Sequence, residues 1–77
     1  MYSYNIENAA NEKAFIDVCA AIEKTIGGLC KVELLVDVDG TQIQQYVAEN
    51  GTIRVYNDFE VDAVYIDSDV NLAEIFG

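Results

Sequence analysis

The chain has 77 residues, 52% of them apolar, and a formal net charge of −10 from 14 acidic and 4 basic residues. This length leaves room for one domain, which we place at residues 1–77, and the apolar content excludes a disordered acidic tail. Neither the ~20-residue apolar run of a membrane-spanning helix nor a signal peptide is visible, so we expect a cytoplasmic protein.

The first predicted element is an amphipathic helix over residues 9–26. Its apolar residues recur at spacings of three and four and so share one stripe, which consists of Phe15, Val18, Cys19, Ile22 and Ile26. We expect Asn8 to cap the start of this helix and Gly27-Gly28 to supply the left-handed residue that ends it.

Residues 31–38 alternate between apolar and polar side chains, which predicts a β-strand. Asp39-Gly40 follows this strand, and the dipeptide is typical of a two-residue hairpin turn. Such a turn would pair Val36 with Ile43. We therefore expect the alternating apolar side chains of both strands to face the helix.

A second hairpin turn is predicted at Asn50-Gly51. A three-residue loop that also includes Glu49 pairs Val47 with Ile53 and keeps the apolar side chains on one face. A two-residue loop at Asn50-Gly51 would instead pair Val47 with Arg54. We therefore predict the three-residue loop.

A fourth strand is predicted over residues 61–67, in which residues 63–66 are apolar on both faces. Either Tyr65 or Ile66, with its alternate neighbours, faces the helix, and the pattern leaves this choice open. Residues 71–76 are expected to form a last helical turn.

These elements predict an α+β fold, in which one N-terminal helix packs on an antiparallel β-meander of three or four strands and a short C-terminal helical turn follows. The helix would cover one set of apolar side chains: Val32, Leu34, Val36, Ile43, Val47, Ile53 and Val55. The outer face would then present a mixed set: Glu33, Leu35, Asp37, Gln42, Gln44, Tyr46, Arg54 and Tyr56. An alternative is that the first residues, Tyr2, Tyr4 and Ile6, fold over this outer face.

Neither catalysis nor a cofactor is predicted, because the chain has no histidine for general base work and no nucleophile in a catalytic setting. A calcium loop that begins at Asp37 fails, since Gly40 falls at its fourth position, where an EF-hand needs glycine at the sixth. We expect no metal site. The alternative is a weakly bound cation among Asp58, Asp67 and Asp69.

The chain contains two cysteines, Cys19 and Cys30. Two cysteines without a histidine do not make a zinc site. We expect both thiols to be reduced and buried, as is usual in the cytosol, and the alternative is a disulfide between them.

The acidic residues are concentrated in the second half of the chain. Residues 32–77 hold ten carboxylates against Arg54 alone, which is a net charge of −9. A net charge of magnitude ~2–8 is enough to keep a small domain soluble, and self-repulsion costs stability, so the excess indicates a role in binding. Carboxylates two residues apart on an extended chain lie about 6.6 Å apart on one face. That spacing is comparable with the spacing of phosphates along a nucleic-acid strand.

The sequence therefore predicts a non-enzymatic inhibitor that mimics nucleic-acid phosphates. Its partner would be the basic surface of a nucleic-acid-binding protein, such as a nuclease or a defence complex. Anti-restriction and anti-CRISPR proteins of phages often have this size and charge, which is a likeness of class and not of sequence. The candidate binding residues are carboxylates that replace phosphates and side chains that add contact area: Asp37, Asp39, Asp58, Glu60, Asp62, Asp67, Asp69, Tyr46, Tyr56 and Leu35. Repulsion should keep the protein away from nucleic acids and anionic membranes.

The alternative is a self-associating structural or adaptor module, in which the outer sheet face pairs with a second copy and the charge only keeps the protein soluble. A homodimer is compatible with both hypotheses.

Overall fold

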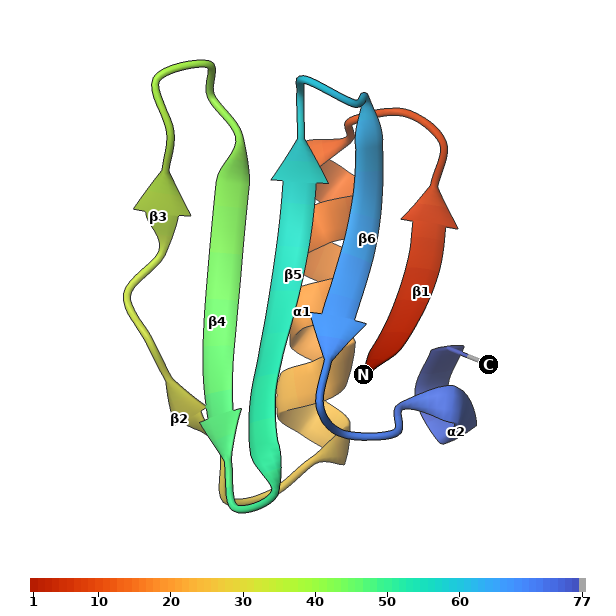
Figure 1. The fold of residues 1–77 in the computed structure, drawn as a ribbon, viewed down its shortest axis with the longest axis vertical. Coiled ribbons are helices and arrows are strands. Elements are labelled where there is room, and N and C mark those ends of the chain that lie inside the picture. The colour runs from red at the N-terminus through yellow and green to blue at the C-terminus, as the bar shows by residue number, and fades with distance from the viewer. Residues whose placement is uncertain (77) are drawn as a thin grey trace.

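The computed structural model describes residues 1–76, in which helix α1 (Glu12–Thr25) lies across one face of an antiparallel sheet (Figure 1). The strands are, in chain order, β1 (Tyr2–Glu7), β2 (Cys30–Lys31), β3 (Leu35–Val36), β4 (Gln42–Ala48), β5 (Gly51–Asp58) and β6 (Ala63–Ser68). Their order across the sheet is β1-β6-β5-β4-β2, and β3 also pairs with β4, so the described sheet is five strands wide. A short helix, α2 (Ala73–Phe76), follows β6. The predicted α+β class and the last helical turn are confirmed, and the prediction of three or four strands was too small.

Strand β1 is the element that the sequence analysis missed, and because of it the helix is not N-terminal. This strand pairs with β6 at one edge of the sheet, with Tyr4 across from Ile66, and does not fold over the outer face. The Tyr4 hydroxyl accepts a hydrogen bond from the Leu72 amide at 2.8 Å and donates one to Asn71 at 3.2 Å. The first and last segments of the described chain are thereby tied together.

Helix α1 begins three residues later than predicted, because Asn11 and not Asn8 is its N-cap. The Asn11 side chain accepts a hydrogen bond from the Ala14 amide at 3.1 Å, as an N-cap does. Asn8 instead accepts a hydrogen bond from the side chain of Asn5. The predicted apolar stripe is confirmed by four buried side chains: Phe15, Val18, Cys19 and Ile22.

The hairpin turn after β3 lies where the sequence predicted it, but its loop contains three residues instead of two. The Asp37 amide donates to the Thr41 carbonyl at 2.9 Å, and the Gly40 amide donates back to the Asp37 carbonyl at 3.0 Å. Gly40 adopts the left-handed backbone with a φ of 90°, as this kind of loop requires. Val36 consequently pairs with Gln42, and the predicted pairing with Ile43 is wrong.

The second turn differs in the opposite sense, because it has two residues, Glu49 and Asn50, instead of three. Ala48 pairs with Gly51, and Tyr46 pairs with Ile53. A shift of one residue moves every side chain of a strand to the other face. Strand β4 therefore turns the side chains of Gln44 and Tyr46 toward the helix, where Ile43 and Val47 were expected.

The core under α1 combines the helix stripe with one face of the sheet. Its sheet residues are fully buried: Tyr46, Ile53, Val55, Val64 and Ile66. In β6, the side chains of Val64 and Ile66 therefore face the helix, and Tyr65 faces the other side of the sheet. Both cysteines are free thiols. Cys19 is buried in this core, but Cys30 is exposed, so the expectation that both thiols are buried is wrong for Cys30.

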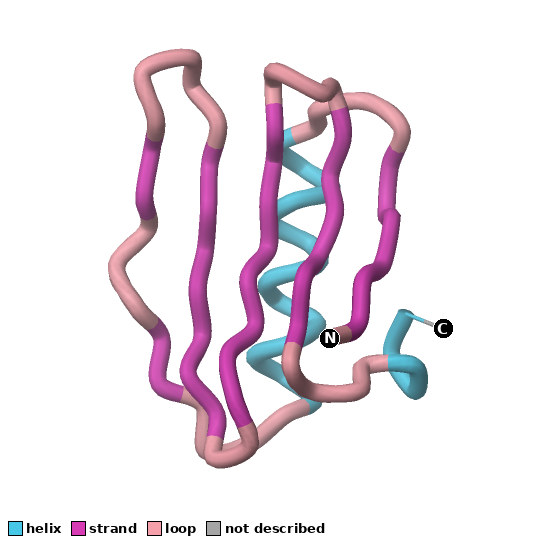
Figure 2. The backbone as a smooth tube through the Cα atoms, in the orientation of Figure 1, coloured by secondary structure: helices cyan, strands magenta, loops and turns pink. Residues whose placement is uncertain are grey.

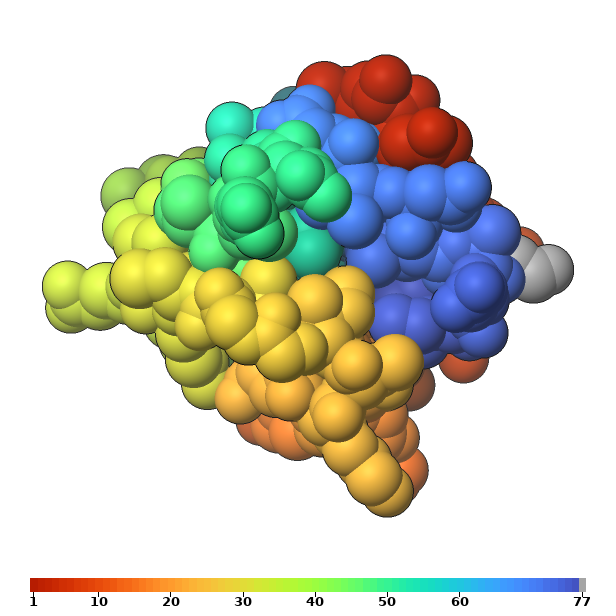
Figure 3. All heavy atoms as spheres, turned by 90° about the horizontal axis from the view of Figure 1, so that it is seen from below, coloured from red at the N-terminus to blue at the C-terminus, as the bar shows by residue number. Residues whose placement is uncertain are grey.

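The edge formed by β2 and β3 lies outside the reach of the helix, which passes behind β5 and β6 (Figures 1 and 2). In the view from below, the segment between β2 and β3 projects from the body of the molecule (Figure 3). The prediction that the helix covers Val32, Leu34 and Val36 is therefore wrong, and all three are exposed. Within residues 1–76, no helix has the length and apolar character to cross a membrane.

The two-residue turn makes a prediction about Gly51, which adopts a φ of 143° and lies against the side chain of Asp69. A Cβ atom at Gly51 would overlap the Asp69 side chain, so Gly51→Ala should lower the free energy of unfolding by about 1–3 kcal/mol. The control is Gly27→Ala, because a Cβ there would have no neighbour within 4 Å. Denaturant unfolding compares the two variants, and equal midpoints would contradict the turn described here.

Candidate protein-binding surface

The two loops at one end of the sheet bring together five of the seven candidate carboxylates. The β3–β4 loop and the β5–β6 turn lie side by side at the upper end in Figure 1. We call this surface the acidic end, and it consists of Asp37, Asp39, Asp58, Glu60 and Asp62. Neither loop contains a lysine or an arginine.

Hydrogen bonds hold these loops to one another and to the segment before α1. The Phe59 amide donates to the Thr41 hydroxyl oxygen at 3.1 Å, which joins the β5–β6 turn to the β3–β4 loop. The Ala10 amide donates to Asp62 Oδ1 at 2.7 Å. Asp62 adopts a left-handed backbone with a φ of 57°, which aspartate tolerates better than most residues. The acidic end is therefore a fixed arrangement of loops.

The carboxylates of the acidic end also stabilise their own turns. Asp58 Oδ1 accepts from the Glu60 amide at 2.9 Å and the Val61 amide at 3.3 Å. Asp39 Oδ1 accepts from the Thr41 amide at 2.9 Å, and this hydrogen bond lowers the pKa of the Asp39 carboxyl. The hydrogen bond to Asp39 favours the charged form of this carboxyl.

The geometry of this group differs from the extended row that the sequence predicted. β5 ends at Asp58, and Glu60 and Asp62 lie in the turn that follows. The three carboxylates therefore surround a turn and do not follow a straight strand at a spacing of about 6.6 Å.

Asp67 and Asp69 lie apart from the acidic end. Asp67 sits across from Arg54 on the side of the sheet away from α1, and it accepts a hydrogen bond from the Ser3 hydroxyl at 3.0 Å. Asp69 accepts a hydrogen bond from the Thr52 amide at 3.1 Å. Among residues 1–76, no group of three acidic or cysteine side chains could hold a metal ion, so the alternative cation site at Asp58, Asp67 and Asp69 is not assembled.

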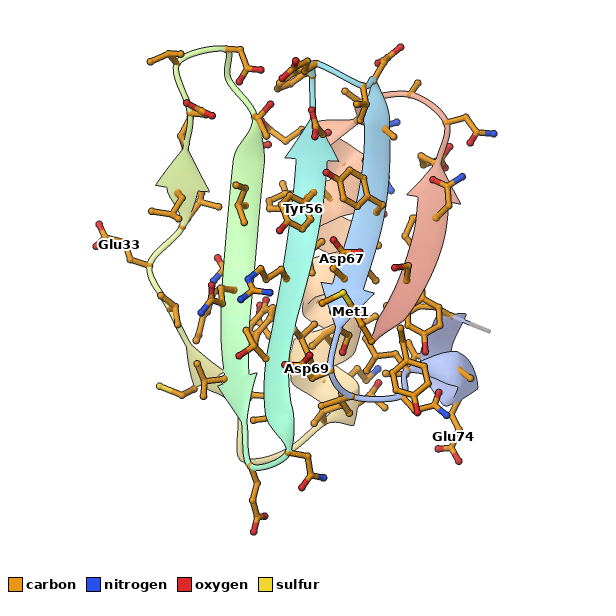
Figure 4. All side chains as sticks on the ribbon, viewed as in Figure 1. Met1, Glu33, Tyr56, Asp67, Asp69 and Glu74 are labelled. Carbon is orange, nitrogen blue, oxygen red and sulfur yellow. The ribbon has the colours of Figure 1, made fainter. Side chains whose placement is uncertain are left out.

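The side of the sheet away from α1, which we call the open face, carries an apolar row across four strands. Leu35 is across from Ile43, Ile43 from Tyr56, and Tyr56 from Tyr65. The rings of Tyr56 and Tyr65 are stacked, with centroids 4.6 Å apart and planes 13° apart. Figure 4 shows Tyr56 over β5 and Asp67 over the neighbouring strand β6.

Two of the three candidate contact residues, Leu35 and Tyr56, lie on the open face, and the third does not. Tyr46 is fully buried under α1, where its hydroxyl donates to the Glu23 carboxylate. Lys31 Nζ lies 3.3 Å from the same carboxylate. The hydrogen bond from Tyr46 lowers the pKa of the Glu23 carboxyl, and the nearby Lys31 ammonium lowers it further. Burial and the hydrogen bond to Glu23 raise the pKa of the Tyr46 hydroxyl.

The sequence analysis missed two members of the apolar row, Ile43 and Tyr65. Ile43 was assigned to the helix face by the wrong turn length. For Tyr65, the alternation within residues 63–66 fits either face. The inward direction of Ile53 and Val55 does not by itself find either residue, because the register decides which side chains of β4 and β6 share that face.

Comparisons with protein-family models, with curated proteins and with solved structures found no match.

The contact between Tyr65 and Asp58 makes a prediction about alkaline pH. The Tyr65 hydroxyl donates to Asp58 Oδ2 at 2.9 Å, and burial together with this carboxylate raises the Tyr65 pKa. The unfolded chain releases the tyrosine proton near pH ~10 and the folded protein retains it. The Tyr65 contribution to stability is therefore complete below about pH 10 and is lost as the pH rises above that value.

The variant Tyr65→Phe removes this titrating group. The free energy of unfolding of Tyr65→Phe should consequently fall less steeply between about pH 9 and pH 11 than that of the unmodified protein. Urea unfolding at several pH values measures both slopes. Identical slopes would show that the hydroxyl of Tyr65 has the same pKa in both states.

Proposed function

We propose that the protein is a non-enzymatic inhibitor whose acidic end binds the basic, nucleic-acid-binding surface of another protein, as anti-restriction and anti-CRISPR proteins do. The observation that supports this proposal is the gathering of Asp37, Asp39, Asp58, Glu60 and Asp62 on two loops that are hydrogen-bonded to each other. A cluster of fixed carboxylates presents negative charges to a basic cleft, as the phosphates of a nucleic-acid backbone do.

The physical advantage of this arrangement is electrostatic. Arginine and lysine side chains that bind DNA neutralise its phosphates and release the counterions condensed on the DNA, so affinity falls as salt rises. Carboxylates that pair with the same side chains should likewise bind more weakly at high salt. This chain, with its net charge of −10, is attracted to such a cleft at long range, which raises the association rate. Occupation of the cleft then excludes the nucleic acid.

The test removes charge from the acidic end without changing the size of the side chains. Asp37→Asn combined with Glu60→Gln takes away two charges, and the matched control, Glu49→Gln combined with Glu74→Gln, takes two from the other end of the molecule. Glu49 lies in the β4–β5 turn. Glu74 lies in α2 (Figure 4). The measurement is displacement of duplex DNA from a panel of purified restriction nucleases and CRISPR effector complexes at increasing salt.

For a nuclease that the protein inhibits, the first variant should bind roughly tenfold more weakly, since each exposed ion pair contributes up to ~1 kcal/mol. The control should bind as the unmodified protein does, and raised salt should weaken all three. Affinity that is independent of salt, or an equal loss in both variants, would rule out recognition through the acidic end.

A second candidate function, self-association, is favoured by the exposed edge at β2 and β3. Among residues 1–76, five of the eleven exposed large apolar side chains lie within this short stretch: Val32, Leu34, Leu35, Val36 and Val38. An edge strand with exposed apolar side chains is a template for pairing with another chain. Pairing of this edge with a second copy would bury these side chains.

Sizing of the protein at low and high salt tests this candidate. A dimer formed through the apolar edge should persist or tighten as salt screens the repulsion between two acidic chains. Val36→Lys should then give a monomer. Val61→Lys is the matched control, because Val61 is 64% exposed and Val36 is 63% exposed. A monomer at every salt concentration would remove the second candidate.

A further inference from the structure

The open face combines an aromatic surface with carboxylates on both sides of it. The apolar row of Leu35, Ile43, Tyr56 and Tyr65 runs across the sheet. Tyr65 is fixed by its hydrogen bond to Asp58 and by the stack with Tyr56. The Tyr56 ring is therefore held flat against its neighbour, and it remains partly exposed.

The carboxylates border this row in the neighbouring rows of the sheet. Asp58 follows Tyr56 by two residues on β5, and Asp67 follows Tyr65 by two residues on β6, so each lies on the same face as the tyrosines. The basic side chain of this face is Arg54, which lies in the same cross-strand row as Asp67. An aromatic ring with carboxylates nearby suits a planar cation.

We propose that the open face binds arginine side chains of the partner, with Tyr56 as the stacking surface and Asp67 as the acceptor, since both oxygens of Asp58 already accept hydrogen bonds. This inference rests on the proposed function, and it adds a second contact that is selective for arginine over lysine. The acidic end recognises positive charge of either kind. The open face supplies the discrimination.

The chemistry of the two cations explains that selectivity. The guanidinium group of arginine is planar and weakly hydrated, so it stacks on an aromatic ring and donates to a carboxylate in the same pose. The ammonium group of lysine is a compact and strongly hydrated charge, which pairs with a carboxylate and gains less from the ring. Tyrosine and arginine are also the residue types that most often dominate the affinity of protein interfaces.

Charge decides between this occupant and the others that an aromatic face could accept. A nucleic-acid base can stack on tyrosine, but its phosphates would meet Asp58, Asp67 and the rest of an acidic chain. A second copy would bring another −10 of charge to the same place. A basic protein surface is the occupant that the charge of this face attracts.

The experiment compares two peptides of equal charge, nona-arginine and nona-lysine, by isothermal titration calorimetry at low salt. Tyr56→Leu should weaken nona-arginine binding by about twofold to fivefold and leave nona-lysine binding unchanged. Tyr56→Phe keeps the ring and should bind both peptides as the unmodified protein does. Circular dichroism of each variant confirms that the sheet is intact.

Each remaining outcome overturns one proposal and not the other. If Asp37→Asn with Glu60→Gln weakens both peptides equally and Tyr56→Leu weakens neither, the acidic end still binds and the open face does not. If Tyr56→Leu weakens both peptides equally, the open face does not select arginine. If the protein is a dimer that Tyr56→Leu dissociates, a second copy occupies the face.

Discussion

The direction in which Tyr46 points determines the rest of this structure. Its ring fills the core under α1, and its hydroxyl donates to Glu23, which Lys31 also contacts. A buried hydroxyl without a partner would cost free energy, and Glu23 in the last turns of the helix supplies that partner. Once Tyr46 is inside, the alternation of β4 requires Gln44 to be inside and Ile43 to be outside. The Gln44 amide donates to the carbonyls of Val32 and Gln45, which satisfies its donors in the interior.

The apolar row of the open face follows from that single orientation. With β4 in this register, Ile43 joins Leu35 to the tyrosines of β5 and β6, and the open face gains a continuous apolar row. The opposite orientation would have left Tyr46 beside Arg54 and interrupted the row at β4. The helix, which packs behind β5 and β6, then leaves the β2–β3 edge uncovered (Figure 2). Core packing and exposed surface are in this way set by one side chain.

The sequence predicts the helix and its buried stripe, the positions of both hairpin turns and the inward side chains of β5. These depend on local patterns: spacings of three and four, glycine in turns, and alternation around Ile53 and Val55. The lengths of the two turns could not be predicted, because the apolar pattern favours a register that buries the valines over one that buries Gln44 and Tyr46. The contact that favours the observed register joins Tyr46 to Glu23, which are 23 residues apart in the chain, and no local pattern contains it. The gathering of Asp37 with Glu60 likewise depends on how the strands are ordered.

The bonds from Ala10 to Asp62 and from Phe59 to Thr41 have an energetic consequence for the unbound molecule. These links prevent the loops from spreading, so like charges are kept near one another at the expense of folding energy. A cationic surface that docks there relieves this tension, and the conformational entropy of the loops has already been lost during folding. Affinity would then come partly from strain that the free protein carries, and added salt should make the isolated chain harder to unfold.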